Sequence, residues 1–398
     1  MQNVIVNKNQ IDEVLDRGVE HIFPDRESLR KVLMSGKRIR LYCGFDPSAP
    51  SLHIGNAIAL NKLSQFQALG HDVIFLIGDF TGMIGDPTDK TSTRQKLTRE
   101  QVNENAQMYK KQASAYLDFS GDNPAQIRRN SEWSDPITFK DLIEISSNFT
   151  VQQMIQRDMF QARLKEEKPI YLHEFLYPLA QGYDSVGMDV DLEVGGNDQM
   201  FNMMAGRHLM KAIKGKEKFV MTLKLLADES GKKMGKTEGN AVFLDQTPQN
   251  IFGSVMAWTD GLIALGFELA TKVSMEKVAE VKKRLADGEN PRNLKMELAK
   301  EMVCLVHGEV AAQEAEEYFV KTFSKKEVPD EMIELKPTAY DLLSILVESK
   351  CVTSKTDARR VVSQNGVKVN QETASDVNAV LKPGDVIQKG KTFFLRVK

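Results

Sequence analysis

The chain has 398 residues, of which 41% are hydrophobic and 27% are charged. This composition is typical of a soluble globular protein and excludes a mostly disordered chain, because the apolar residues suffice for a buried core. The length allows roughly two or three domains. No apolar run reaches the roughly 18 residues of a membrane span, and the polar, acidic beginning of the chain is unlike a signal peptide.

Cysteine content and charge distribution narrow the class further. The three cysteines are widely scattered, so they favour a reducing cytoplasm over a disulfide framework or a zinc site. The net charge is −2, but residues 337–398 carry +4 and the first 336 residues carry −6. A basic unit on an acidic body indicates a polyanionic partner. The alternative is a charged surface that only keeps the protein soluble.

The first half of the chain is predicted to alternate strands and helices. A helix is predicted from residue 53 to residue 68, after the first strand. The apolar runs that predict strands are 40–45, 73–77, 189–194 and 221–226. A succession of strand, Gly-containing turn, helix and strand is typical of a parallel α/β sheet.

Between these strands, residues 120–168 are predicted to be a helical insertion. Apolar residues recur at helical spacing in 139–149 and 151–164. A block of this kind can separate two halves of a sheet and carry a dimer contact. The alternative is that it only covers one face of the sheet.

The second half of the chain begins with helices alone. The segment 293–306 is amphipathic, and His307-Gly308 supplies a helix stop. Residues 325–336 are rich in Lys, Glu and Pro and are the predicted linker. The remainder, 337–398, is predicted to form a compact unit of helices and short strands.

The first chemical motif is Asp46-Pro-Ser-Ala-Pro-Ser-Leu-His53-Ile-Gly55-Asn56, at a strand exit and a helix start. A helix N-terminus presents free N–H groups and the positive end of its dipole, which suit a phosphate. His53 adds a donor for phosphate oxygens, and Gly55 leaves room for a flat ring or a ribose against the backbone. The alternative is that a lone histidine here is only a cap or a surface residue.

The second motif is Gly231-Lys-Lys233-Met-Gly-Lys236-Thr-Glu-Gly-Asn240. Its lysines stand among small residues, so they can form a cationic loop that closes over a triphosphate. Such a loop would neutralise charge on a departing pyrophosphate. The alternative is a solvated, lysine-rich turn.

The third motif is a polar helix face. Tyr177, Gln181 and Asp184 follow one another at i, i+4 and i+7, so they project to the same side. Buried side chains of these types need hydrogen-bond partners, and a pocket that grips an ammonium and a hydroxyl would supply them. Asp86, in Gly-Met-Ile-Gly-Asp-Pro, is a second candidate for the ammonium.

The fourth motif is Gly195-Gly196-Asn-Asp198-Gln, which follows a predicted strand. Two glycines at the carboxyl end of a strand allow a ligand to approach the backbone in the crevice of an open α/β sheet. Asp198 is placed to accept hydrogen bonds from ribose hydroxyls. A purely structural turn is the alternative.

Together, the order and spacing of these motifs resemble the class I aminoacyl-tRNA synthetases. His53-Ile-Gly-Asn56 is similar to their HIGH motif, and Lys233-Met-Gly-Lys236-Thr to their KMSKS loop. The polar helix face and the Gly-Gly turn resemble the tyrosine-binding helix and the ribose-contacting turn of tyrosyl-tRNA synthetases. The stretch 342–370, with its Asn-Gly-Val-x-Val-Asn ending, looks like an S4 RNA-binding domain.

The resemblance covers essentially the whole chain and points to the bacterial type of tyrosyl-tRNA synthetase. It implies an α/β fold with a Rossmann-like, parallel-sheet catalytic domain that contains the helical insertion. An all-helical domain and a small α+β, S4-like RNA-binding domain would follow. The implied boundaries are 1–240 for the catalytic domain, 241–324 for the helical, anticodon-binding domain, 325–336 for the linker and 337–398 for the S4-like domain.

The implied activity has two steps. L-tyrosine and ATP form tyrosyl-adenylate and pyrophosphate, and tyrosine then passes to the 3′ end of tRNA(Tyr). ATP is a substrate whose phosphates carry Mg²⁺, and no metal bound by the protein itself is expected. The implied partners are tRNA(Tyr), L-tyrosine, ATP and a second copy of the chain that docks through the insertion.

The resemblance also implies a role for each motif residue. Tyr42 and Asp184 would bind the phenolic hydroxyl of the substrate. The residues expected to hold its ammonium are Asp86, Tyr177 and Gln181. The residues expected to act in catalysis are His53, Asn56, Lys90, Arg94, Lys233 and Lys236. The residues expected to bind ATP are Cys43, Asp46, His53, Gly55, Asn56, Gly196, Asp198, Lys233 and Lys236. The residues expected to bind RNA are Lys355, Arg359, Arg360 and Lys368.

Some positions depart from the common pattern of the family. Asn56 replaces the second histidine of HIGH, Gly235 and Thr237 replace the serines of KMSKS, and Glu193 stands where many relatives have glutamine. None of these changes removes an essential group.

Two other functions stay open at this point. A tryptophanyl-tRNA synthetase would share the fold, but Tyr42 paired with Asp184, together with the S4-like unit, argues against it. An RNA-binding factor that retains an inactive synthetase body is the second alternative. A protein that only binds RNA would gain nothing from His53 and the two lysines of the loop, which argues against that alternative.

Overall fold

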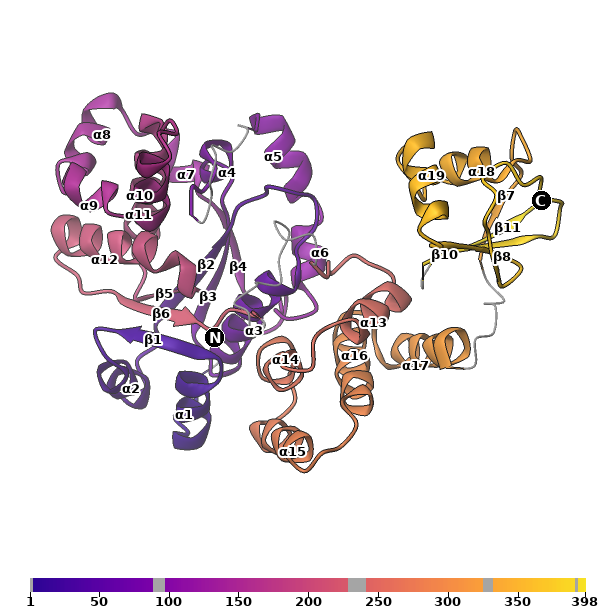
Figure 1. The fold of residues 1–398 in the computed structure, drawn as a ribbon. Helices are drawn as coiled ribbons and strands as arrows, with labels where there is room; N and C mark the ends of the chain where they lie inside the picture. Colours follow the sequence, from indigo (N-terminus) through magenta and orange to yellow (C-terminus); the bar gives the residue numbers. More distant parts are fainter. Residues whose placement is uncertain (1–2, 89–96, 228–240, 325–331, 391–392) are drawn as a thin grey trace.

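The computed structural model describes residues 3–88, 97–227, 241–324, 332–390 and 393–398. Figure 1 shows an α/β body, a group of helices that follows it in the chain, and a small C-terminal unit of sheet and helices. Four residues expected to act on the phosphates lie outside the described residues: Lys90, Arg94, Lys233 and Lys236.

A six-stranded sheet forms the centre of the α/β body, in the order β1-β6-β5-β2-β3-β4. Its strands are β1 (Val19–Phe23), β2 (Arg40–Phe45), β3 (Asp72–Ile77), β4 (Gln126–Arg129), β5 (Leu192–Gly196) and β6 (Phe219–Leu223). The pairings from β6 across to β4 are parallel, and β1 runs antiparallel to β6. The prediction of a parallel α/β sheet is therefore confirmed.

The connectivity of this sheet determines where a ligand can bind. The chain runs from β2 outward to β3 and β4, and then returns to the other side of β2 as β5 and β6. The strand order thus reverses between β2 and β5. In open α/β sheets, the crevice beyond the carboxyl ends of the strands at such a point is the usual ligand site.

Helices cover both faces and the ends of this sheet. Those of the N-terminal part are α1 (Lys8–Asp16), α2 (Arg26–Met34), α3 (Ile54–Ala68), α4 (Thr81–Ile84), α5 (Arg99–Ala106) and α6 (Tyr109–Ala113). Two longer ones flank β5, α11 (Leu172–Met188) before it and α12 (Met200–Lys214) after it. The start of β5 was predicted too early, because Asp189 ends α11 in the left-handed region at φ 50°. The strand predicted at 221–226 is displaced as well, because β6 spans Phe219–Leu223.

The predicted insertion 120–168 is only partly helical. Gln126–Arg129 forms β4, which pairs with β3 at the edge of the sheet. Its polar sequence concealed it, because an edge strand needs no continuous apolar run. The helices that follow are α7 (Ser131–Ser134), α8 (Phe139–Ser146), α9 (Val151–Ile155) and α10 (Asp158–Lys165). The predicted single helix 151–164 is wrong, since the backbone is extended at Arg157, with φ −62° and ψ 136°.

The insertion contacts both the sheet and the neighbouring helices. Ile145 and Met154 of the insertion share a buried cluster with Leu179 of α11 and Leu209 of α12. Trp133 of the insertion packs against a buried cluster that includes residues of β2 and β3. The insertion therefore does more than cover one sheet face, and its dimer contact stays a prediction.

The helical segment after the body is joined to it by a common core. Its helices are α13 (Pro248–Met256), α14 (Leu262–Ala270), α15 (Met275–Ala286), α16 (Pro291–His307) and α17 (Glu309–Phe319), followed by a π-helical turn, Val320–Ser324. Phe267 and Leu294 belong to the same buried cluster as Leu60 and Leu63 of α3. The buried Arg17 adds hydrogen bonds to four carbonyl oxygens at the end of α14 and beyond it.

The C-terminal unit has a core of its own, which includes Leu342, Leu346, Ile387 and Leu395. Its elements are β7 (Ile333–Leu335), α18 (Leu342–Glu348), α19 (Lys355–Ser363), β8 (Val367–Val369), β9 (Glu372–Thr373), β10 (Val386–Lys389) and β11 (Phe393–Val397). They form a five-stranded sheet in the order β7-β11-β10-β8-β9. The predicted linker 325–336 therefore ends too late, because β7 lies within it, pairs with β11 and is part of this sheet.

Candidate active site

A cavity of about 410 Å³ opens where the strand order reverses, at the carboxyl ends of the central strands. Every residue of the body that is expected to bind tyrosine or ATP, and that the structure describes, lines it, and so does Glu193. The expected residues are Tyr42, Cys43, Asp46, His53, Gly55, Asn56, Asp86, Tyr177, Gln181, Asp184, Gly196 and Asp198. Segments far apart in the sequence thus meet in one site, as the resemblance implies.

The N-terminus of α3 forms one wall of the cavity. His53 is its N-cap, and the Nδ1 atom of His53 accepts a hydrogen bond from the Gly55 N–H at 3.0 Å. The side chain of Asn56 accepts from the His53 N–H at 3.0 Å and completes a capping box. Because Nδ1 accepts, the neutral ring carries its proton on Nε2. His53 is therefore both a helix cap and a residue of the cavity wall.

Asp46, at the exit of β2, lies between two hydroxyl donors. Thr81 Oγ1 donates to Asp46 Oδ1 at 2.6 Å, and the Tyr177 hydroxyl donates to Asp46 Oδ2 at 2.8 Å. A Cβ on Gly78 would lie 2.0 Å from the same carboxylate, so only glycine fits beside it. Burial and the neighbouring Asp46 charge raise the pKa of Tyr177 well above its usual value, which keeps its hydroxyl protonated.

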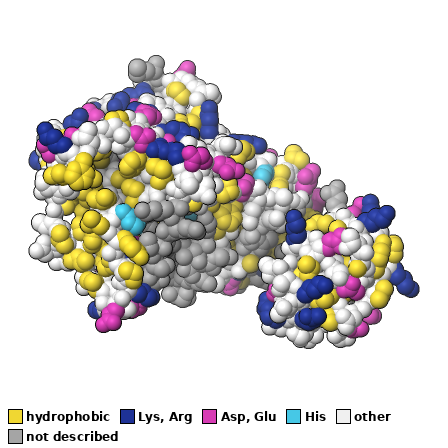
Figure 2. Space-filling view, turned by 90° about the horizontal axis from the view of Figure 1, so that it is seen from above, with side chains coloured by type: hydrophobic (Ala, Val, Ile, Leu, Met, Phe, Trp, Pro, Cys, Tyr) yellow, Lys and Arg dark blue, Asp and Glu magenta, His cyan; other side chains and the backbone are white. Residues whose placement is uncertain are grey.

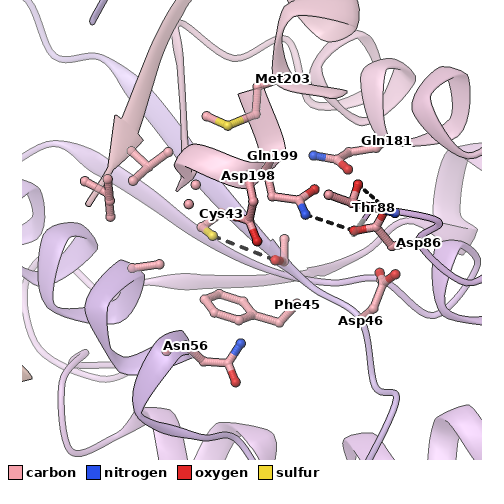
Figure 3. Close-up of a pocket in the computed structure, with 18 of the residues that line it drawn as sticks. Cys43, Phe45, Asp46, Asn56, Asp86, Thr88, Gln181, Asp198, Gln199 and Met203 are labelled. Atoms are coloured by element: carbon pink, nitrogen blue, oxygen red, sulfur yellow. Dashed lines mark hydrogen bonds between the residues drawn. The ribbon is translucent and has the colours of Figure 1, made fainter. Parts of the chain in front are cut away.

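Asp86 is held by a group that includes a residue to which the sequence assigned no role. The Thr88 N–H and hydroxyl donate to Asp86 Oδ1 at 2.9 and 2.7 Å, and Gln199 Nε2 donates to Asp86 Oδ2 at 2.9 Å. Figure 3 shows Asp86, Thr88 and Gln199 together on one side of the cavity. Gln199 belongs to the Gly-Gly turn motif. Its place in that motif is the sequence signal that could have predicted a role for it in the site.

Tyr42 and Asp184 lie in the buried end of the cavity, with exposures of 1% and 2%. The Tyr42 hydroxyl is 3.0 Å from Ser185 Oγ. The Asp184 carboxylate accepts from Trp133 Nε1 at 2.9 Å and from Asn130 Nδ2 at 3.3 Å.

Burial also raises the pKa values of Tyr42 and Asp184. Burial raises the pKa of Asp184 well above its usual range, although the donors from Trp133 and Asn130 oppose that shift. The pKa of Tyr42 is raised by burial and by the nearby carboxylates of Glu193 and Asp184.

The sequence argument for a ligand therefore needs a correction. It reasoned that Tyr177, Gln181 and Asp184 lack partners unless a ligand supplies them. The protein supplies a partner to each: Asp46 to Tyr177, Glu193 to Gln181 at 3.3 Å, and two donors to Asp184. The polar face is real, but it is already hydrogen-bonded before any ligand binds. Trp133 and Asn130 were missed, because they follow β4, which the sequence concealed.

The Gly-Gly turn forms the wall opposite α3. Asp198 lies in the short 3₁₀ helix η1 (Asn197–Gln199), directly after β5. A Cβ on Gly196 would lie 2.5 Å from the Asp198 carboxylate, so glycine is needed for Asp198 to occupy this place. Cys43 is buried, which raises the pKa of its thiol well above the usual value, so it is a neutral lining group.

The described residues offer little for a metal or a membrane. Nowhere in the described ranges do three or more His, Cys, Asp or Glu side chains gather closely enough to hold a metal ion. Within the same ranges, no helix is long and apolar enough to cross a membrane.

The four basic residues expected to bind RNA are exposed on the C-terminal unit. Lys355, Arg359 and Arg360 lie on α19, and Lys368 lies on β8. Arg360 also pairs with Asp357 at 2.5 Å, so part of its charge is neutralised within the helix. Figure 2 shows several Lys and Arg side chains on this unit.

Comparison with known families identifies the class of protein. Residues 34–324 match the family of class I tRNA synthetases (W and Y), and residues 320–396 match the tyrosine–tRNA ligase SYY-like C-terminal domain. The chain therefore belongs to the class I tRNA synthetases of the tryptophan and tyrosine group.

Its relatives and structural neighbours carry related names. The chain is 42% identical over 402 residues to a tyrosine–tRNA ligase of Carboxydothermus hydrogenoformans, with 97% of each chain covered. It is 40% identical over 391 residues to that of Thermotoga maritima, covering 97% of this chain and 96% of the relative. A C-terminally truncated mitochondrial tyrosyl-tRNA synthetase of Coccidioides posadasii superimposes with a TM-score of 0.65 at 26% identity, covering 78% of this chain and 92% of its own.

Proposed function

We propose that the protein is a tyrosine–tRNA ligase, an aminoacyl-tRNA synthetase. It activates L-tyrosine with ATP to tyrosyl-adenylate and pyrophosphate, and then transfers tyrosine to the 3′ end of tRNA(Tyr). The observation that carries this function is the buried pair Tyr42 and Asp184 at the end of a cavity in a class I synthetase body. Full-length relatives with this name, at 40–42% identity, support it.

The buried end of the cavity would select tyrosine. The phenolic hydroxyl of the substrate would exchange hydrogen bonds with Tyr42 and Asp184. Phenylalanine would leave both groups without that partner in a buried site, and tyrosyl-tRNA synthetase is itself the standard example of how strongly this disfavours it. The substrate ammonium would lie among the Asp86 carboxylate, the Gln181 amide oxygen and the Tyr177 hydroxyl oxygen.

The α3 side of the cavity would bind ATP. The α3 N-terminus and His53 suit the phosphates, and Asp46 would lie close to the α-phosphate. The residues proposed for ribose and adenine are Cys43, Gly55, Asn56, Gly196 and Asp198. The cations proposed to stabilise the leaving pyrophosphate are Lys90, Arg94, Lys233 and Lys236. Mg²⁺ would arrive with the ATP phosphates.

This chemistry needs no covalent enzyme intermediate. The tyrosine carboxylate attacks the α-phosphorus of ATP, and the bond to the pyrophosphate oxygen breaks. The protein contributes by aligning the two substrates and by stabilising the charge that grows on the departing phosphates. A general base is not required, because the attacking carboxylate is already ionised at neutral pH.

The surface of the insertion supports a homodimer. The strongly exposed hydrophobic side chains of this region are Phe139 at 79%, Val151 at 72% and Leu172 at 77%. Figure 2 shows hydrophobic side chains gathered on the end of the molecule that carries α8–α12. A contiguous apolar surface of this kind is typical of a protein interface. A second copy of the chain is the proposed occupant.

The remaining assignments follow the family. The catalytic division at 1–240, the helical, anticodon-binding division at 241–324 and the C-terminal RNA-binding unit are proposed on the resemblance. The helical division shares its core with the body, so we do not expect it to fold separately. Cytoplasmic location is proposed from the cysteine content and the family.

The decisive test is tyrosine-dependent exchange between pyrophosphate and ATP, with phenylalanine and tryptophan as competing substrates. Exchange with tyrosine alone is the expected result. Exchange with tryptophan would identify the other synthetase of this group. No exchange with any of them, together with tRNA binding, would identify an RNA-binding factor with an inactive body.

A further inference from the structure

A lysine buried behind the cavity is not explained by the function proposed above. Lys218 directly precedes β6, and its side chain has an exposure of 0%. Its sequence context, Lys-Glu-Lys-Phe, is that of an ordinary surface lysine. Fully buried lysines are rare unless their ammonium is paired and hydrogen-bonded. The partners of Lys218 therefore show what it does.

The ammonium of Lys218 has three partners from three different elements. Its Nζ donates to Ser185 Oγ of α11 at 2.8 Å and to the Met203 carbonyl of α12 at 3.2 Å. It also forms an ion pair with the carboxylate of Glu193 on β5. An ammonium has three protons, so all of them are used. Burial lowers the pKa of Lys218, and the Glu193 carboxylate opposes that shift.

The backbone around this cluster leaves no spare room. A Cβ on Gly206 of α12 would lie 2.6 Å from Lys218 Nζ, 2.8 Å from Ser185 Oγ and 3.2 Å from Glu193 Oε2. A Cβ on Gly182 of α11 would in turn lie 3.0 Å from the backbone N of Gly206. Helices α11 and α12 thus approach closely over the ion pair. This packing holds Lys218 and its partners in one arrangement.

Two of the partners of Lys218, Ser185 and Glu193, also contact residues proposed to bind tyrosine. Ser185 Oγ lies 3.0 Å from the Tyr42 hydroxyl, and Gln181 Nε2 donates to Glu193 Oε1 at 3.3 Å. Tyr42 and Gln181 line the cavity, whereas Lys218 does not. The ammonium is therefore connected, through one intervening residue in each case, to two groups proposed to bind tyrosine.

The hydrogen-bond inventory limits the arrangements open to Ser185. An ammonium can only donate, so it occupies one of the two acceptor sites of Ser185 Oγ. Ser185 then keeps one proton and one acceptor site for the Tyr42 hydroxyl and the Glu193 carboxylate, which lies 3.4 Å away. A neutral residue at 218 would free the occupied site, so the Ser185 and Tyr42 hydroxyls could take more orientations.

We propose that Lys218 is a positioning residue for tyrosine selection, which acts through Ser185 on Tyr42 and through Glu193 on Gln181. This proposal deepens the proposed function and rests on it. It also gives a reason for a carboxylate at 193: Glu193 is the counter-ion of Lys218 and accepts a hydrogen bond from Gln181. Lys218 touches no substrate in this arrangement.

The test uses single and paired neutral variants of the full-length protein. Lys218→Met alone leaves the buried Glu193 charge unpaired, so it is expected to lower stability strongly. Lys218→Met combined with Glu193→Gln removes both charges and is expected to recover much of the thermal stability. Its tyrosine KM should still be raised about tenfold, the loss expected for one hydrogen bond to a charged group. The ratio of kcat/KM for tyrosine over phenylalanine should fall by a similar factor, with the ATP KM unchanged.

A second buried ion pair provides the matched control. Arg163 and Glu174 pair at 2.7 Å with side-chain exposures of 1% and 3%, and neither lines the cavity. Arg163→Met combined with Glu174→Gln should change thermal stability but leave the tyrosine/phenylalanine ratio at its original value. This control separates the general cost of removing a buried pair from an effect on selection.

Ser185→Ala provides a variant that keeps the ion pair of Lys218 and Glu193 and removes the hydroxyl that connects Lys218 to Tyr42. It should lower the tyrosine/phenylalanine ratio while the protein stays folded, and so it decides the case even where the Lys218 variants do not fold. A folded double variant, or a folded Ser185→Ala, with the original ratio and tyrosine KM would overturn the role of Lys218. The function itself would fail differently: the unaltered protein would then show no tyrosine-dependent exchange.

Discussion

The two ends of the cavity are built in different ways. At the buried end, Tyr42, Asp184 and Glu193 have exposures of 1–2%, and each has hydrogen-bond partners within the protein. At the α3 end, His53 and Asn56 are only half-buried, and they are arranged around a helix N-terminus.

This difference predicts separate roles for the two ends of the cavity: the buried end selects the amino acid, and the α3 end affects the rate of its activation with ATP. A group of known shape, such as a phenol, is recognised by donors and acceptors that are fixed before it binds. Charge that appears only in the transition state is met by cations and N–H groups directed at the phosphates. We therefore expect changes at the buried end to alter which amino acid reacts, and changes at the α3 end to alter how fast ATP reacts.

The largest effect is expected from the two lysines that are proposed to act on the ATP phosphates. Lys233→Ala and Lys236→Ala should each slow adenylate formation by about 10²–10³-fold, because each removes a cation that is proposed to stabilise the leaving pyrophosphate. The tyrosine KM should change little. Single-turnover formation of adenylate, with tyrosine affinity measured separately, checks both statements. A collapse of tyrosine affinity at an unchanged rate would contradict the assignment.

At the buried end, Asp184→Asn should damage selection more than ATP binding. The amide keeps the shape of the side chain but changes its hydrogen-bonding pattern toward Trp133 and the substrate. The tyrosine/phenylalanine ratio is expected to fall by about 10–100-fold, the range for leaving one buried hydrogen-bonding group unsatisfied. Michaelis constants for tyrosine, phenylalanine and ATP give the answer, and an unchanged ratio would remove Asp184 from the hydroxyl-binding role.

A third change tests whether the C-terminal unit acts independently of both ends of the cavity. The chain should be cut after Ser324 rather than after Lys336, because β7 belongs to the C-terminal sheet. Exchange of pyrophosphate should stay near normal, since every proposed residue of the cavity remains. Aminoacylation should fall by about tenfold or more through weaker tRNA binding, with a shallower dependence on salt, because fewer phosphates are contacted. Full charging by the truncated protein would rule out this role of the unit.

The smallest expected effect compares two neighbours on α19. Arg360 shares its charge with Asp357 at 2.5 Å. Arg359→Ala should therefore weaken tRNA binding more than Arg360→Ala, by a few-fold, and should reduce the slope of log affinity against log salt by about 1. Binding titrations at several salt concentrations measure this. Equal losses for the two variants would show that the ion pair opens when RNA binds.

The elements that were predicted well share one feature, and so do those that were missed. β2, β3 and α3 were found because their apolar residues face a common core, which produces a continuous or periodic pattern. β4 and β7 were missed because both are edge strands: a polar or mixed sequence can pair there through its backbone alone. The break at Arg157 was missed because the apolar spacing continues across it.

The sequence by itself determined the family, the parallel sheet and the motif residues, because turns, helix starts and strand exits have local signatures that the chain carries in order. Only the tertiary structure decided which polar groups partner one another. Tyr177 with Asp46 and Lys218 with Glu193 are separated by 131 and 25 positions. No local pattern encodes such pairs. From its sequence context alone, a lysine next to a strand is expected to be exposed. Only the close approach of α11 and α12 shows that the ammonium of Lys218 is buried and bonded to three partners.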